Sequence, residues 1–276
     1  MTAPAQHNRG RAIAALVVVA VVFAALMCGL GYFIAVLMRD AGTSGGGPGA
    51  PTSASAAGTA SPAIGEDPSL QAQQDALADE PMLQLPMSAA QPQPLVAETA
   101  GPPIVVPAPT GRVVPDGPPV ATGFPHTPEG ALAQLAAIDE GAFGTTDLHR
   151  VHEVYAWAAL PGAVPEDQWS PTGGVTTLID HLGGRSKALQ AQVVFQAVQG
   201  QLKGTIGQDF VVACVLGQMD VTAASTARAG VGDCQRMVWR DGRWWIGPGA
   251  QPAAAPSAWP GSADAVRAGW RELRRG

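Results

Sequence analysis

The stretch "DCQRMVWRDGRWWIG", residues 233–247, decides the fold that we predict for this chain. Apolar and polar residues flank an Asp-Gly pair, the dipeptide that favours a two-residue type I′ turn between antiparallel strands. Such a hairpin sets Trp239 opposite Trp244, and cross-strand aromatic pairs each contribute roughly 0.2–1 kcal/mol. We therefore interpret the stretch as scaffold rather than as a catalytic motif. The structural hairpin residues are Trp239, Asp241, Gly242, Trp244 and Trp245.

A second hairpin is predicted just before the first one. Val-rich segments bounded by Gly and Asp lie on both sides of residues 223–225. If the chain turns there so that Thr222 faces Thr226, then Cys214 falls directly opposite Cys234. Antiparallel partners have Cα atoms about 4.5–5.5 Å apart, which suits a disulfide. Two buried thiols are the alternative interpretation.

Helices are expected to precede this sheet. Thr127 is a good N-cap ahead of Pro128, an apolar stripe follows through Ile138, and Gly141 can end the helix. A second helix fits residues 147–160, and a shorter third one fits residues 175–182. These segments predict an α+β fold in which about three helices pack on a curved, cone-like antiparallel sheet.

Two segments of this domain, residues 122–276, are harder to interpret. Residues 188–202 carry apolar positions that suit either a helix or a strand, and we favour a strand in the second half. The tail, residues 262–276, has the pattern of a short amphipathic helix whose arginines face outward. That basic face could contact anionic lipid headgroups, or it could be a solvated face favoured by the helix dipole.

The N-terminal part of the chain predicts a membrane anchor. Residues 12–38 are uncharged, and a helix of that length spans about 40 Å, more than the ~30 Å hydrocarbon core. This run is too long for the apolar region of a secretory signal. Arg9 and Arg11 precede it, so the positive-inside rule leaves residues 1–11 as a cytoplasmic stub and puts the rest of the chain outside.

Residues 39–121 read as a disordered linker. Pro, Gly, Ala and Ser dominate, and aromatic residues are absent, so the segment lacks the apolar area that would offset its ordering entropy. One island, "PSLQAQQDALADEPMLQLPM", has apolar residues and helix formers. It is either a docking peptide or a transient helix within the tether.

Composition and motifs exclude several functions. The net charge of −6 gives no reason to expect nucleic-acid binding, and the three cysteines lack the spacing of a zinc site. We find no phosphate-binding loop, metalloprotease motif or nucleophile elbow, so we expect no enzyme activity, cofactor or metal. Three residues are candidates to line a cavity inside a cone: Tyr155, His181 and Asp220.

The order of elements resembles the nuclear-transport-factor-2-like cone fold. More narrowly, "GFPHTPEGALAQLAAID" (123–139) and "GSADAVRAGWREL" (261–273) resemble an actinobacterial family of anchored proteins often associated with conjugative elements. A stub, an anchor, a tether and such a cone are similar in plan to assembly factors of type IV secretion and conjugation systems. No catalytic residues come with this resemblance.

We therefore expect a single-pass protein of a bacterial plasma membrane whose extracytoplasmic domain is an interaction module. The resemblance implies that its partners are other envelope-complex proteins, with lipid bound through residues 12–38 and a homo-oligomer as an option. The alternative is a cone that binds a small molecule or catalyses a reaction on one, since folds of this type often contain a pocket.

Overall fold

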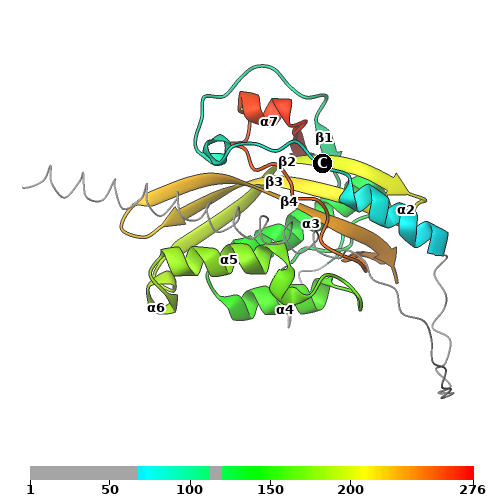
Figure 1. The fold of residues 1–276 in the computed structure, drawn as a ribbon, viewed down its shortest axis with the longest axis horizontal. Coiled ribbons are helices and arrows are strands. Elements are labelled where there is room, and N and C mark those ends of the chain that lie inside the picture. Colours follow the sequence, from blue (N-terminus) through cyan, green and yellow to red (C-terminus); the bar gives the residue numbers. More distant parts are fainter. Residues whose placement is uncertain (1–67, 112–119) are drawn as a thin grey trace, which may run out of the picture.

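The structure, a computed structural model, describes residues 68–111 and 120–276 and is an α+β fold built on one curled sheet (Figure 1). The sheet has six strands, and only the β1–β6 pair is parallel. In sheet order the strands are β1 (Ile104–Val106), β6 (Arg271–Arg275), β2 (Gln192–Ile206), β3 (Phe210–Thr222), β4 (Thr226–Arg240) and β5 (Arg243–Ile246).

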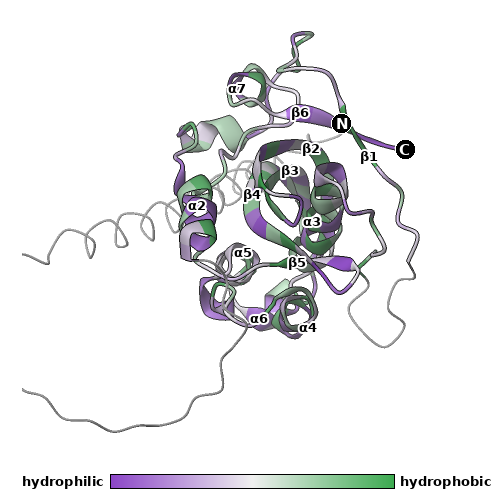
Figure 2. Ribbon diagram, turned by 90° about the vertical axis from the view of Figure 1, so that its right-hand side faces the viewer, coloured by the Kyte–Doolittle hydropathy of each residue, from purple (hydrophilic) through white to green (hydrophobic). Residues whose placement is uncertain are grey.

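Four helices pack on one face of the sheet. Helix α3 lies within the curl, and the others lie beneath it (Figures 1 and 2). Residues of these helices and of the inner sheet face form the largest apolar cluster, which includes Leu132, Trp169 and Met237. The helices are α3 (Pro128–Phe143), α4 (Leu148–Ala158), α5 (Ser170–His181) and α6 (Arg185–Ala188).

Both predicted hairpins are confirmed with their registers. Thr222 pairs with Thr226, Cys214 pairs with Cys234, and the two cysteines form a disulfide. In the β4–β5 hairpin, Trp239 faces Trp244 across the Asp-Gly turn. Both turn residues have positive φ, 51° at Asp241 and 78° at Gly242, as a type I′ turn requires.

Helix α3 begins as predicted and ends later than predicted. The Thr127 hydroxyl accepts a hydrogen bond from the Gly130 N–H at 3.1 Å, which caps the helix. The helix then continues through Gly141 to Phe143. A Cβ atom at Gly141 would lie 3.1 Å from Val120 and 3.5 Å from Val154, so this glycine permits close packing rather than ending the helix.

The prediction of a linker over residues 39–121 is wrong for its second half. Residues 68–98, here called the strap, contain α2 (Pro68–Asp79) and the 3-10 turn η1 (Met87–Ala90), and β1 follows. The "PSLQAQQDALADEPMLQLPM" island therefore docks on the domain to which it is covalently joined.

Charged contacts hold the strap against the sheet. An Asp75 carboxylate oxygen lies 2.7 Å from the guanidinium of Arg236, whose side chain is only 3% exposed. At the C-terminal end of α2, Lys203 Nζ donates to the carbonyl of Ala78 at 2.8 Å, where the helix dipole favours a cation. Both basic residues lie far along the chain, so local composition could not reveal these contacts.

The predicted C-terminal helix is only half correct. Helix α7 covers Ala263–Arg267, and Gly269, just after the C-cap Ala268, has a φ of 87° that suits glycine. Arg271–Arg275 then form β6 and join the sheet. Three of the four arginines that we expected on a free basic face pair with carboxylates: Arg267 with Asp264, Arg274 with Glu272 and Arg275 with Glu140. The fourth, Arg271, donates to the carbonyl of Pro102 at 2.7 Å.

The ambiguous segment 188–202 is mostly strand, because α6 ends at Ala188 and β2 begins at Gln192. The predicted third helix begins five residues earlier than expected, at Ser170. Within 68–111 and 120–276, no helix is long and apolar enough to cross a membrane. The predicted stub 1–11, the predicted anchor 12–38 and the first part of the predicted linker lie outside the described residues.

Candidate functional site

The most unusual chemical feature of the domain is a pair of carboxyl groups buried inside the curl. Asp139 projects from the middle of α3, is 0% exposed, and neither of its carboxylate oxygens has a hydrogen-bond partner. Asp233 lies on β4 and is also buried. Charged residues are rarely buried without a partner, so this pair is the candidate site that the structure offers.

Asp233 is the better hydrogen-bonded member of the pair. Its Oδ1 atom accepts a hydrogen bond from the hydroxyl of Ser170, the first residue of α5. Its Oδ2 atom accepts one from Gln235 Nε2 at 2.8 Å, and the same amide lies 3.3 Å from Ser170 Oγ. The network therefore ties β4 to the start of α5.

Burial dominates the electrostatics of both acids. Desolvation raises the pKa of Asp233 to about 6, although its hydrogen bonds to Ser170, Gln235 and the backbone of Cys234 act in the opposite direction. Desolvation also raises the pKa of Asp139 well above its ordinary value, and the charges of Asp233 and Glu140 add to this. Burial and the neighbouring negative charges thus both disfavour the ionised form of Asp139.

The surroundings of the acids are filled by side chains. Trp169, Leu135 and Met237 are among the largest completely buried side chains, and they belong to the same apolar cluster inside the curl. Two neighbouring polar atoms, Trp169 Nε1 and Gln235 Oε1, are buried without a partner. Both carboxyl groups therefore lie in a packed part of the interior, close to other buried polar atoms.

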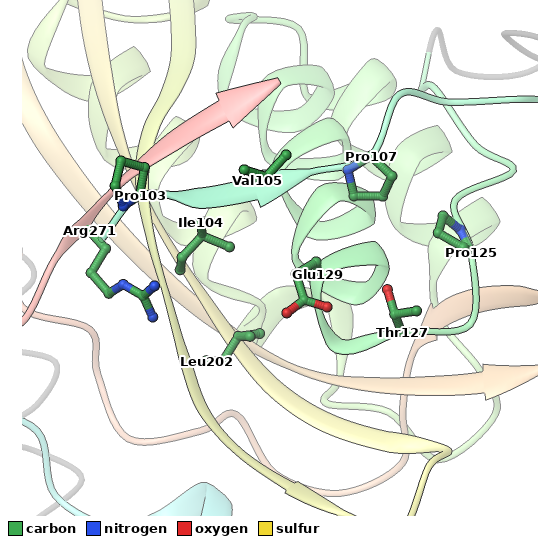
Figure 3. A pocket seen from close by; sticks show the side chains of 9 residues that line it. All are labelled: Pro103, Ile104, Val105, Pro107, Pro125, Thr127, Glu129, Leu202 and Arg271. Atoms are coloured by element: carbon green, nitrogen blue, oxygen red, sulfur yellow. The ribbon is translucent and has the colours of Figure 1, made fainter. Parts of the chain in front are cut away.

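Two cavities among the described residues are lined by neither of the acids. The larger, about 440 Å³, lies between β1 and the start of α3, where Glu129 and Arg271 flank walls of proline and aliphatic side chains (Figure 3). The second, about 300 Å³, lies between Leu70 of α2 and Trp239 near the β2–β3 turn.

The three predicted cavity residues do not meet. The hydroxyl of Tyr155 donates to the carbonyl of Val164, and burial raises its pKa. His181, at the end of α5, has its Nδ1 atom 2.7 Å from the carbonyl of Thr177. Tyr155 thus joins α4 to the loop that follows it, and His181 bonds within α5.

Asp220 lies on the opposite face of the sheet. Along β3 it alternates with the inner residues Val211, Ala213 and Val215, so it shares the outer face with Cys214. Its carboxylate lies 3.6 Å from the guanidinium of Arg228 and accepts a hydrogen bond from Gln218. It therefore cannot line the interior of the curl.

The hairpin tryptophans position the start of α3. His126 stacks on Trp239 with ring centroids 4.5 Å apart, and Trp244 Nε1 donates to the carbonyl of Pro125 at 2.9 Å. On the other side of the hairpin, the Arg243 guanidinium lies between Trp157 and Trp245, 4.1 and 3.2 Å from their ring centroids. These contacts are intramolecular and support the interpretation of the hairpin as scaffold.

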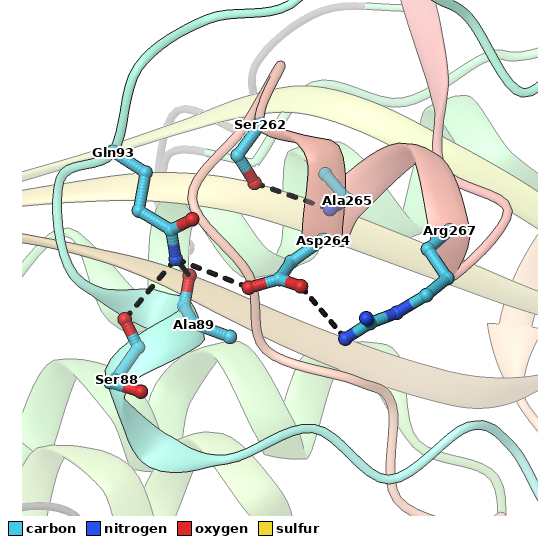
Figure 4. Close-up of polar contacts among 7 residues, drawn as sticks. All are labelled: Ser88, Ala89, Gln93, Ser262, Asp264, Ala265 and Arg267. Atoms are coloured by element: carbon cyan, nitrogen blue, oxygen red, sulfur yellow. Dashed lines mark hydrogen bonds and ion pairs between the residues drawn. The ribbon is translucent and has the colours of Figure 1, made fainter.

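The strap covers the outer face of the sheet and the disulfide. Met82 Sδ lies 3.5 Å from Cys234 Sγ and 4.0 Å from Cys214 Sγ. Further along, the Gln93 amide donates to the carbonyl of Ala89 and to the Asp264 carboxylate, which joins the strap to α7 (Figure 4).

Exposed large apolar side chains concentrate on the strap, which carries four of the seven in the described residues. Those four are Leu70, Leu83, Met87 and Leu95, and the other three are Val105, Leu189 and Val194.

Neither a search for metal-binding clusters nor comparison with known proteins assigns a function to the domain. Within the described ranges, no group of three or more His, Cys, Asp and Glu side chains is arranged to hold a metal ion. Comparison with known proteins finds no matching family model, no matching curated protein and no matching solved structure.

Sequence reasoning missed Asp139 and Asp233, although each carried a signal. Asp139 falls four residues after Leu135, on the apolar stripe of the predicted helix. Asp233 alternates with Cys234, so once the disulfide is placed on one face, Asp233 must lie on the other. Each is a single acidic residue at a position that the sequence pattern assigns to the core, and this signal could have identified both as candidate site residues.

Proposed function

We propose that this protein is a single-pass, membrane-anchored interaction module whose domain works outside the plasma membrane as a scaffold component of a conjugation or secretion-type envelope complex. The support comes from the uncharged segment 12–38, from the cone-like order of elements, and from the resemblance carried by residues 123–139 and 261–273. A disulfide between Cys214 and Cys234 also suits an extracytoplasmic domain.

The observation that carries the proposal is the contrast between interior and surface. Side chains fill the interior of the curl, whereas the strap presents exposed apolar side chains such as Leu83 and Leu95. Ligand-binding folds keep an open, mostly apolar pocket, and the carboxyl groups here line neither of the two cavities described above. Exposed apolar residues rimmed by polar ones are more typical of protein–protein contact sites.

Binding of a small molecule inside the curl is the second candidate, and one observation favours it. Two buried carboxyl groups with raised pKa values are the kind of pair that enzymes use for acid–base chemistry. A substrate that bound to Asp233 Oδ1 would have to displace the hydroxyl of Ser170, which donates to this atom.

Photo-crosslinking in intact cells tests the proposed function. A photoreactive amino acid replaces Leu83 on the strap, and the matched control places it at Asp241, in the exposed β4–β5 turn. We expect Leu83 to capture subunits of an envelope complex and Asp241 to capture far fewer. Identical capture from both positions, or no capture from well-expressed protein, would contradict the proposal.

A further inference from the structure

The larger cavity, of about 440 Å³, lies at one end of the sheet rather than between the buried acids. It is bounded by β1, the last strand in the sheet order, and by the start of α3 (Figure 3). Ile104 and Leu202 line it with aliphatic side chains, and Pro103, Pro107 and Pro125 complete its apolar walls. Ligand sites typically have volumes of about 300–1,000 Å³, so the cavity is of a size that binds small ligands or short peptide segments.

Two opposite charges face this cavity. Figure 3 shows the side chains of Glu129 and Arg271 pointing toward each other across it. The Nε atom of Arg271 donates to the Pro102 carbonyl at 2.7 Å, which orients the guanidinium and leaves its two Nη atoms for another partner. Within residues 68–111 and 120–276, neither the Glu129 carboxylate nor the Arg271 Nη atoms have a hydrogen bond or an ion pair.

The main chain of β1 adds a polar contact at the same cavity. The Val106 carbonyl accepts from the Gly276 N–H at 2.9 Å, so the peptide groups of Val106 face β6. Successive residues of a strand direct their peptide groups to opposite sides, and Val105 therefore presents its N–H and C=O to the outer edge. The next residues on that side, Pro103 and Pro107, have no N–H to donate. The edge can thus bond a short segment at one residue but cannot template a long strand.

We propose that this cavity binds a short, extended peptide segment that carries a basic and an acidic residue two positions apart. Side chains at positions i and i+2 lie on the same face of an extended chain. The basic side chain contacts Glu129, the acidic one accepts from the Nη atoms of Arg271, and the peptide backbone bonds to Val105. The aliphatic stems of the two side chains cover Ile104 and Leu202.

Charge complementarity and the short open edge both favour this occupant. The opposite charges of Glu129 and Arg271 fit a ligand that carries both signs and disfavour one of a single sign. The outward peptide groups of Val105 match those of a peptide, which a simple zwitterion lacks. This inference is independent of the proposed envelope-complex role, because it concerns a surface other than the strap.

Isothermal titration calorimetry of the full-length chain in a non-ionic detergent tests the proposal. The probes are two acetylated and amidated peptides, Ser-Lys-Ser-Glu-Ser and Ser-Glu-Ser-Lys-Ser, because either chain direction can bond to Val105. We expect one order to bind, and its dissociation constant to rise roughly tenfold or more in Glu129→Gln and in Arg271→Gln. Arg274→Gln is the matched control, since Arg274 lies on the same strand but pairs with Glu272, and it should leave binding unchanged.

A charge swap distinguishes recognition from a simple loss of folding. The Glu129→Arg/Arg271→Glu double variant exchanges the two charges, so we expect it to bind the peptide order that the parent chain rejects. A double variant that retains the parent urea midpoint but binds neither order would overturn the proposal.

Two further results would also overturn it. One is a parent chain that binds neither peptide, or both equally. The other is binding of aminohexanoate, a zwitterion without peptide groups, as tightly as the better peptide, which would assign the cavity to small zwitterions instead. Neither result bears on the strap, which photo-crosslinking tests separately.

Discussion

Asp139 and Asp233 show what a single buried group does to the stability of this domain. Each has a pKa raised by burial, so the folded state holds a proton that the unfolded chain has already released. Such a group contributes full stability below its unfolded pKa of about 4, and that stability is lost as the pH rises through the folded value. For Asp233, with a folded pKa of about 6, the loss is about 3 kcal/mol above pH 6.

The first prediction concerns the pH profile of unfolding. Asp139→Asn cannot ionise, so we expect its free energy of unfolding to fall less than that of the parent chain between pH 4 and pH 8. Urea denaturation followed by tryptophan fluorescence measures this. Asp220→Asn on the outer face is the control and should retain the parent slope. Parallel profiles for Asp139→Asn and the parent chain would show that the buried carboxyl does not titrate in this range.

The disulfide is the other residue-level feature with a measurable effect. Cys214 and Cys234 are separated by 20 positions in the sequence, and closing a loop of this size stabilises the folded state by about 3 kcal/mol. The Cys214→Ala/Cys234→Ala double variant should lose about that amount in urea denaturation under oxidising conditions. A reduced parent chain that is as stable as the oxidised one would contradict the prediction.

At the scale of elements, the sequence correctly predicted the two hairpins, because turn residues and cysteine spacing that lie close together in the chain determine their registers. The Asp241-Gly242 turn fixed one register, and the spacing of the cysteines around residues 223–225 fixed the other. The strap was missed because its segment is rich in Pro, Ala and Gln, and its anchoring partner, Arg236, lies 161 positions after Asp75. The β6 strand was missed for a similar reason, since it is extended only because β1 and β2 pair with it.

The strap gives a third prediction. Asp75→Asn removes the charge partner of the buried Arg236, and since Asp75 is itself 47% exposed, we expect a loss of roughly 1–3 kcal/mol, less than a fully buried pair would show. The loosened strap should also uncover the disulfide beneath Met82. Reduction by dithiothreitol should therefore be faster, as measured by thiol titration.

A neighbouring carboxylate provides the control for the strap. Asp79 lies at the exposed end of the same helix, so Asp79→Asn should alter both stability and the rate of reduction much less. If the two variants behave alike, the Asp75–Arg236 ion pair is not what holds the strap in place.

At the scale of the whole molecule, the proposed topology gives a fourth prediction. With an anchor at residues 12–38 and Arg9 and Arg11 before it, a C-terminal tag should be digested by protease added to intact spheroplasts. An N-terminal tag should be digested only after lysis. Protection of the C-terminal tag in intact spheroplasts would reverse the topology and remove the oxidising compartment that the disulfide suits.

The docking of the strap also sets how far the domain can stand from the bilayer. If the chain leaves the membrane at Met38, only residues 39–67 connect it to the domain, 29 residues instead of the 83 of the predicted linker. At no more than about 3.6 Å per residue, the greatest height falls from about 300 Å to about 100 Å. A partner at the far side of a thick wall would then be out of range, and the proteins that this domain meets should lie close to the membrane.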